Sequence, residues 1–193
     1  MDAKLYYIQA PMNSSKSAML LMKAYNFEER GLRVLCLKPA IDNRDGEGII
    51  KSRVGIKRKC IMTKDIDNIF QIIKEYNNTH LLNWVLVDEA QFLKSEQIDQ
   101  LARVVDELGI NVMCYGLRAD FRTKLFEGSK RLFELADSIQ EIKQSCSCGR
   151  KAIINARVDE KGNIVTNGNQ VEIGGNDRYI ALCRKCYYDK IKK

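Results

Sequence analysis

The 193-residue sequence has no long hydrophobic run. No apolar stretch reaches the roughly 18 to 20 residues that a membrane-spanning helix needs. The start of the chain, MDAKLYY, also lacks the cationic head and apolar core of a signal peptide. We therefore expect a cytoplasmic protein that has no membrane partner.

The sequence also lacks a run of five or more basic residues, although its net charge is +7. Scattered basic residues are typical of a solvated surface or of a protein that binds small phosphorylated ligands, and they favour no nucleic-acid partner. Histidine is nearly absent as well. The single one, His80, lies in the segment NNTH, and we expect it to be an ordinary surface residue.

Cysteine is the residue type that is unexpectedly common, with seven copies. In a cytosolic chain this favours a metal site or buried thiols over disulfides. Four of them form two closely spaced pairs, Cys146-Ser-Cys148 and Cys183-Arg-Lys-Cys186, on either side of a turn-rich segment. Four thiolates fill a tetrahedral coordination sphere, so we predict a structural Zn²⁺ site. Free buried thiols remain the interpretation for Cys36 and Cys114, which lie in apolar segments.

Strand-like and helix-like segments alternate along the first three quarters of the chain. Strands are predicted at residues 4–9, 33–37, 84–87 and 111–115, and helices at residues 17–30, 65–76, 95–108 and 129–136. Asp65 is the predicted N-cap of the second helix, with Ile66, Ile69, Phe70 and Ile73 on one face. Residues 42–55 are predicted to be a loop.

This alternation predicts an α/β fold, a parallel sheet with helices on both faces. The order of its strands cannot be read from the sequence. The sequence pattern changes after about residue 143, where turn-rich, hairpin-like sequence such as VDEKGNIV replaces the alternating strands and helices. We therefore expect two domains, residues 1–143 for nucleotide binding and residues 144–193 for zinc binding.

The stretch from Ala10 to Ser17, APMNSSKS, resembles a phosphate-binding loop. It follows a strand, precedes a helix and ends in Lys16-Ser17, which would contact the phosphates and Mg²⁺. Both loop glycines are replaced, by Ala10 and Ser15. If position 15 needs a positive φ, Ser15 is strained by about 1 kcal/mol. The alternative is a helix start capped by Ser14 or Ser15, with Lys16 exposed.

A second motif is Val85-Leu-Val-Asp88-Glu89, an apolar strand that ends in two acids. One carboxylate at the end of a strand beside the first one can hold Mg²⁺, and the other can accept a proton. The alternative is a helix start that is enriched in acids. Both motifs would lie at one edge of one sheet.

Taken in order, these residues resemble the P-loop, zinc-containing thymidine kinases of the cytosolic type, in their bacterial branch. The resemblance covers nearly the whole chain. It is carried by PMNxxKS, by the Asp42-Asn-Arg44 segment, by DEAQF at residues 88–92, by YGLRADFR at residues 115–122 and by IGGNDRY at residues 173–179. The cysteine pairs complete it. It implies a RecA-like P-loop domain and a small zinc domain that carries a lasso loop.

The resemblance also implies an activity, transfer of the γ-phosphoryl group of ATP to the 5′-hydroxyl of thymidine. Glu89 would be the catalytic base. ATP would be bound by Ala10, Pro11, Met12, Asn13, Ser14, Ser15, Lys16, Ser17, Asp88 and Gln91. Thymidine would be bound by Asp42, Arg44, Leu117, Phe121, Phe126, Ile173, Gly174 and Tyr179. Deoxyuridine would be a poorer substrate because a methyl group is worth only about 1–3 kcal/mol to an apolar pocket.

Assembly and regulation are implied by the resemblance alone: a homodimer or homotetramer, and inhibition by thymidine triphosphate. Two other readings stay open at this point. One is a zinc-ribbon ATPase that acts on nucleic acid, because DEAQ is helicase-like. The other is an inactive nucleotide-binding homologue, which Ser15 suggests.

Overall fold

The computed structural model describes residues 2–44, 46–170 and 178–192. A six-stranded sheet in the order β5-β2-β6-β7-β1-β8 forms its centre, and all neighbouring strands run parallel. The strands are β1 (Leu5–Gln9), β2 (Val34–Pro39), β5 (Ile61–Thr63), β6 (Trp84–Val87), β7 (Asn111–Gly116) and β8 (Ser138–Glu141). The predicted α/β class is confirmed. The strand order corrects one expectation, because β7 lies between β1 and β6.

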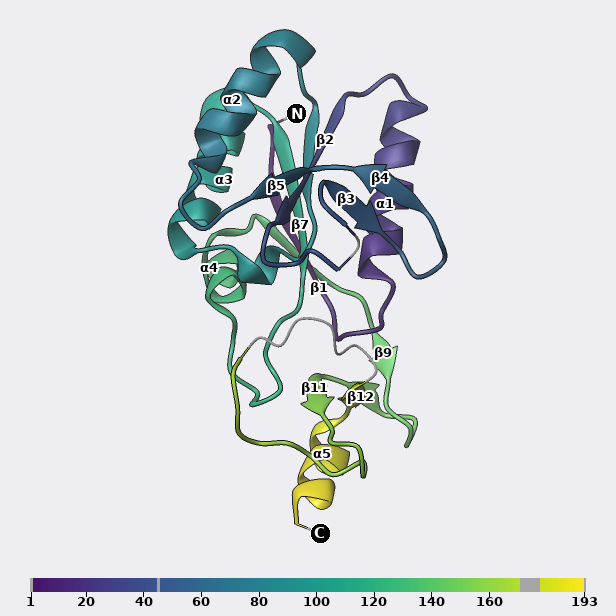
Figure 1. The fold of residues 1–193 in the computed structure, drawn as a ribbon. Helices are drawn as coiled ribbons and strands as arrows, with labels where there is room; N and C mark the ends of the chain where they lie inside the picture. Colours follow the sequence, from purple (N-terminus) through teal and green to yellow (C-terminus); the bar gives the residue numbers. More distant parts are fainter. Residues whose placement is uncertain (1, 45, 171–177, 193) are drawn as a thin grey trace.

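Helices cover both faces of this sheet, as Figure 1 shows. The long ones are α1 (Lys16–Glu28), α2 (Ile69–His80), α3 (Ser95–Leu108) and α4 (Glu127–Leu135). Successive residues of a strand point to opposite faces. Accordingly Leu35 and Leu37 of β2 pack in the cluster under α2 to α4, whereas Val34 and Cys36 pack in the cluster under α1.

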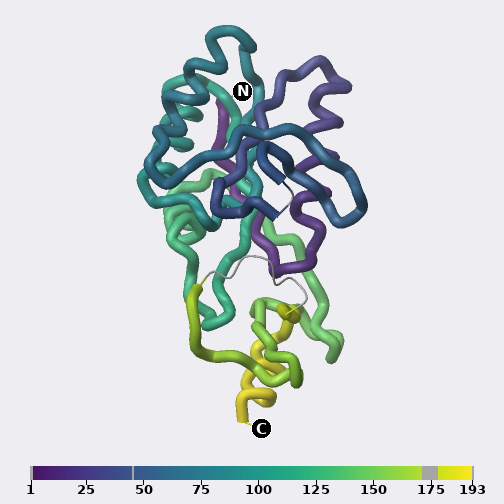
Figure 2. Tube along the Cα trace, viewed as in Figure 1, coloured from purple at the N-terminus to yellow at the C-terminus, as the bar shows by residue number. Residues whose placement is uncertain are grey.

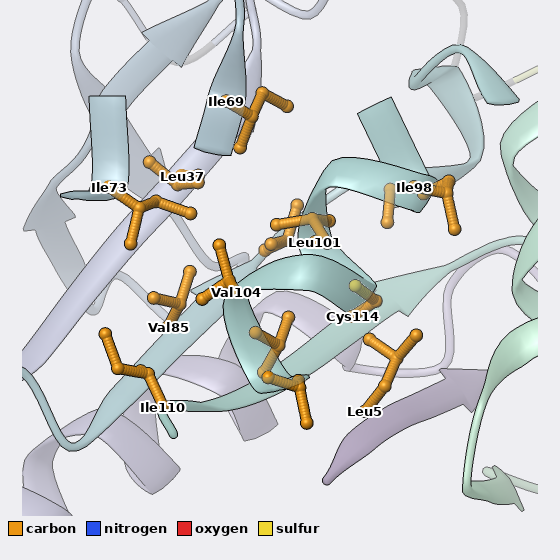
Figure 3. Packing of buried hydrophobic residues seen from close by; sticks show 14 of the residues in the cluster. Leu5, Leu37, Ile69, Ile73, Val85, Ile98, Leu101, Val104, Ile110 and Cys114 are labelled. Atoms are coloured by element: carbon orange, nitrogen blue, oxygen red, sulfur yellow. The ribbon is translucent and has the colours of Figure 1, made fainter. Parts of the chain in front are cut away.

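The larger of these clusters is the main core, shown close up in Figure 3. Ile69 and Ile73 of α2 and Leu101 of α3 are fully buried against strand residues such as Val85. Cys114 is also fully buried here, and Cys36 is buried on the other face, as predicted. Within the described residues, no helix is both long and apolar enough to cross a membrane.

The start of α2 differs from the prediction. The helix begins at Ile69 and Asn68 is its N-cap, with the Asn68 side chain accepting a hydrogen bond from the backbone N–H of Gln71. Asp65 lies before the helix, where its carboxylate pairs with Lys94 at 3.5 Å. Ile66, expected on the packed face, is 92% exposed. Asp and Asn are about equally good N-caps, so this preference does not decide between Asp65 and Asn68. The full burial of Ile69 fixes the start of the helix after Asn68.

The predicted loop at residues 42–55 contains part of a hairpin. Strand β3 (Ile49–Lys51) pairs with β4 (Lys57–Lys59) in antiparallel register. Ile50 anchors this hairpin, because it is fully buried and belongs to the cluster under α1. Two edge strands of the main sheet, β5 and β8, were not predicted from the sequence either.

Residues after β8 gather at one end of the molecule (Figure 2). They form the strand pairs β9 (Gln144–Ser145) with β10 (Lys151–Ala152) and β11 (Ile154–Arg157) with β12 (Tyr179–Leu182), followed by helix α5 (Arg184–Ile191). A separate buried cluster holds them together. The VDEKGNIV segment turns back on itself through a bridge between Val158 and Ile164. The boundary at residue 143 remains a prediction.

Candidate functional site

The loop between β1 and α1 has the backbone of an anion site. Ser15 is left-handed, with φ 61° and ψ 24°, and it is followed by helical Lys16. Asn13 is left-handed as well, with φ 63°. Such a change of hand points successive N–H groups toward one concave space, and the start of a 13-residue helix adds its dipole. The positive φ that the loop pattern implied for position 15 is present.

Lys16 is buried, with 7% of its surface exposed. Its Nζ donates a hydrogen bond to the Pro11 carbonyl at 3.0 Å, and the Ser14 hydroxyl donates to the same carbonyl at 2.7 Å. Ser15 makes no side-chain cap. These contacts contradict the alternative of a serine-capped helix start with an exposed lysine. Burial lowers the pKa of Lys16, and the nearby carboxylates of Glu89 and Asp88 oppose this effect.

Asp88 lies just after β6 and is 2% exposed. Burial and, after it, the charge of Glu89 raise the pKa of its carboxyl to about 7. A hydrogen bond with Ser17 and the charge of Lys16 act in the opposite direction. A buried carboxylate beside a second acid favours a neighbouring cation, because a cation offsets both the desolvation and the repulsion.

Glu89 has a left-handed backbone, with φ 50° and ψ 36°. Two donors hold its carboxylate: Nη2 of Arg44 lies 3.1 Å from Oε1, and the Gln91 amide donates to Oε2. Gln91 also accepts a hydrogen bond from the backbone N–H of Leu117 at 3.0 Å. A bulky residue in this conformation is uncommon and concentrates at functional sites.

Asp42 joins the same network. Its carboxylate pairs with Arg44 and, at 3.2 Å, with the fully buried Lys38. Burial by itself raises the pKa of Asp42, but the hydrogen bond and charge of Arg44 and the charge of Lys38 outweigh it and lower the pKa overall. The side chains of Asp42, Arg44 and Glu89 therefore form one connected set.

These residues surround a single cavity of about 470 Å³. Most of the residues predicted for ATP and thymidine lie on its wall: Met12, Asn13, Ser14, Ser15, Lys16, Ser17, Asp42, Arg44, Asp88, Glu89, Gln91, Leu117, Phe121, Phe126 and Tyr179. The predicted residues that do not line it are Ala10 and Pro11, the first two residues of the loop. Ile173 and Gly174 fall outside the described residues.

One side of the cavity is apolar. Phe121 and Phe126 are 1% and 5% exposed, and Leu117 is 8% exposed. Phe126 contacts Phe92 edge to face, with ring centroids 5.7 Å apart. The guanidinium of Arg157 covers the Phe121 ring at 3.8 Å from its centroid. These side chains are part of the packed interior and of the cavity wall at the same time.

Several wall residues were not predicted. Asn155, from β11, accepts a hydrogen bond from the backbone N–H of Met12 at 2.7 Å and donates one to the Ala119 carbonyl at 3.0 Å. Arg53, from the β3–β4 turn, also lines the cavity, as do Asp120 and Gln170, whose side chains bond at 3.0 Å. No sequence motif marks Asn155 or Gln170, because their neighbours along the chain carry no recognisable pattern.

The four paired cysteines come together at the far end of the molecule. One ligand atom from each lies within 4.8 Å of the others, and the sulfurs of Cys148 and Cys183 are 3.6 Å apart. Four sulfurs arranged tetrahedrally at about 2.3 Å from Zn²⁺ are about 3.8 Å from one another. The cluster can therefore hold a metal ion. We refer to these four residues, Cys146, Cys148, Cys183 and Cys186, as the cysteine cluster.

Comparison with known proteins agrees with this geometry. A family model described as thymidine kinase matches residues 3–187. The thymidine kinase of Zymomonas mobilis is 48% identical over 189 residues, which are 98% of both chains. That of Mannheimia succiniciproducens is 45% identical over 191 residues, 99% of this chain and 98% of the relative. That of Novosphingobium aromaticivorans is 49% identical over 183 residues, 95% of both.

Proposed function

The chain belongs to the thymidine kinase family, and on that premise we propose that it transfers the γ-phosphoryl group of ATP to the 5′-hydroxyl of thymidine. The observation that carries the proposal is the convergence of Lys16, Ser17, Asp88 and Glu89 on one cavity. A loop suited to phosphates, a buried lysine and two acids are the parts that phosphoryl transfer requires. The product is thymidine monophosphate.

The loop and Lys16 bind the phosphates of ATP. Backbone N–H groups of residues 13–17 surround the oxygens, and the Lys16 ammonium neutralises charge on the β and γ groups. The Lys16 side chain is directed back toward its own loop by the bond to Pro11. It is therefore already close to the place where the phosphates lie.

Ser17 and Asp88 fit Mg²⁺. Both supply oxygen ligands, which Mg²⁺ prefers, and their side chains are already hydrogen-bonded to each other. When bound with ATP, the ion neutralises charge on the β and γ oxygens. The raised pKa of Asp88 supports this role, because its carboxylate is buried next to Glu89 and a bound cation would offset both the desolvation and the repulsion.

Glu89 accepts the proton of the 5′-hydroxyl. As that oxygen attacks the γ-phosphorus, the bond between the phosphorus and the β–γ bridging oxygen breaks and ADP leaves with its electron pair. Arg44 and Gln91 hold the Glu89 carboxylate in place. Because the Gln91 amide is engaged by Glu89 and Leu117, we assign it to positioning Glu89 rather than to binding ATP directly.

Thymidine occupies the apolar side of the cavity. Leu117, Phe121 and Phe126 surround the thymine base, and Met12 and Tyr179 lie at the same cavity. Asp42 and Arg44 approach the ribose and the phosphates. An apolar wall accommodates the 5-methyl group, which makes deoxyuridine the poorer substrate. The lasso residues Ile173 and Gly174 stay a prediction.

The cysteine cluster binds Zn²⁺ in a structural role, since four thiolates leave no open coordination position for water. The metal closes a loop of 34 residues between Cys148 and Cys183, which includes the predicted lasso. Family membership is the support for two further proposals, a homodimeric or homotetrameric assembly and inhibition by thymidine triphosphate. It supports a cytoplasmic location as well.

ATP-dependent conversion of labelled thymidine tests the proposal. The wild-type protein should make thymidine monophosphate, and Glu89→Gln should lower kcat by at least about 10²-fold, the usual loss when a general base is removed. The variant should fold and bind zinc as the wild type does. Absence of turnover in the wild type would refute the activity, and a near-normal kcat in Glu89→Gln would remove that residue from the base role.

A further inference from the structure

Among the residues that the structure describes, four cations line the cavity: Lys16, Arg44, Lys51 and Arg53. Two of them are already committed, since Lys16 bonds to the Pro11 carbonyl and Arg44 bonds to Asp42 and Glu89. Among the same described residues, four acids line the cavity, Asp42, Asp88, Glu89 and Asp120, so the formal charges of these eight side chains balance. A triphosphate that enters the cavity therefore needs a cation that is not already paired with a carboxylate.

Arg53 can supply that charge. Within the described part of the chain its guanidinium makes no hydrogen bond or ion pair, and the residue is exposed at the cavity. The charge of Arg53 is close enough to Lys16 to contribute, after burial and the charge of Arg44, to the lowered pKa of that lysine. The two cations therefore face the same space from different elements.

The β3–β4 hairpin holds Arg53 at this position. Ile50 anchors the hairpin in the cluster under α1, and Arg58 forms a two-pronged ion pair with Glu28 near the end of that helix. The turn is closed by Ser52, whose backbone N–H donates to the Ile56 carbonyl at 2.8 Å. Figure 1 shows β3 and β4 beside α1. The turn residues Ser52, Arg53 and Val54 line the cavity, so the docked hairpin presents its turn to that space.

The chemistry of phosphoryl transfer favours a guanidinium here. In the transition state negative charge is spread over the three equatorial oxygens of the transferring group. A guanidinium can donate two parallel hydrogen bonds to such oxygens, whereas the ammonium of Lys51 acts as a point charge. Building on the phosphoryl transfer proposed above, we propose that Arg53 binds the γ-phosphoryl group in the transition state and is a catalytic residue of this kinase.

Steady-state kinetics of Arg53→Ala, Arg53→Lys and Lys51→Ala test the assignment. Lys57→Ala is the matched control, because Lys57 belongs to the same hairpin, is exposed and is absent from the cavity wall. Arg53→Ala should lower kcat by about 10²–10³-fold, as loss of one transition-state donor does, with KM for thymidine within about threefold. Arg53→Lys should recover only part of this loss. Added ethylguanidinium should raise kcat of Arg53→Ala but not that of Lys57→Ala.

The outcomes separate the two proposals. If wild-type protein phosphorylates thymidine and Arg53→Ala has the kcat of the Lys57→Ala control, the role of Arg53 is wrong while the kinase activity stands. The same holds if Arg53→Ala raises only KM for ATP, or if the kcat loss occurs in Lys51→Ala instead. If the wild type transfers no phosphoryl group, the proposed function itself fails. Thermal unfolding should be equal in all four variants, since Arg53 has no described bond to lose.

Discussion

Ser15 offers a direct measurement of strain in the phosphate loop. Its φ of 61° lies in the left-handed region, where a side chain costs about 1–2 kcal/mol. Glycine adopts this region freely, but it also gives the unfolded chain more freedom, which offsets about 0.4–1 kcal/mol. Ser15 makes no capping hydrogen bond, so its side chain contributes none that would be lost. We therefore expect Ser15→Gly to stabilise the protein by about 0.5–1 kcal/mol.

For a chain of this length such a gain raises Tm by roughly 1–4 °C, which scanning calorimetry of the zinc-loaded protein resolves. Ser14→Gly is the matched control. Ser14 has no positive φ, and its hydroxyl donates to the Pro11 carbonyl at 2.7 Å, so this change should lower Tm. Ser15→Ala keeps the strain and should leave Tm nearly unchanged. If Ser15→Gly lowers Tm as Ser14→Gly does, the left-handed backbone is not the source of strain.

Two further perturbations probe the scaffold around the site. A Cβ at Gly128 would lie 2.5 Å from the Ala90 carbonyl oxygen, so Gly128→Ala must push α4 away from the 3-10 turn (Ala90–Phe92) that follows Glu89. We expect the free energy of unfolding, measured in urea, to fall by about 1–3 kcal/mol. An unchanged urea midpoint would contradict this packing. Treatment with a zinc chelator should make the cysteine cluster react with iodoacetamide while Cys36 and Cys114 stay unmodified. Burial shields these two thiols and raises the pKa of both. Mass spectrometry reads out the order of modification, and an earlier reaction of Cys36 or Cys114 would refute the prediction.

Much of the fold follows from local sequence pattern. The helix at residues 95–108 was predicted to the residue because its apolar face is regular and Gly109 ends it with a left-handed C-cap. The start of α2 was misplaced because Asp65 and Asn68 are both suitable N-caps, and only tertiary packing of Ile69 decides between them. The edge strand β8 was missed, since its sequence, SIQE, is mostly polar and partly exposed.

The site could be predicted where its residues form motifs on adjacent positions. Asp88 and Glu89 directly follow β6, and Lys16 and Ser17 begin α1 after the loop that follows β1. Each pair is adjacent in sequence, so the approach of the two pairs follows from the parallel sheet. Arg53 could not be found in this way, because residues 42–55 look like a polar loop until Ile50 is seen to be buried. The strand order places β7 between the two motif strands, which no local pattern reveals.

Asn155 links two walls of the cavity, at Met12 and at Ala119, to the C-terminal part of the chain. One amide group touches the backbone beside the nucleotide loop and, with its other end, the backbone beside the nucleobase wall. Strand β11 thus contacts two walls of the cavity through one side chain. A change in how the C-terminal part of the chain folds would therefore reach both walls of the cavity, so this part could not be exchanged for another without altering the shape of the site.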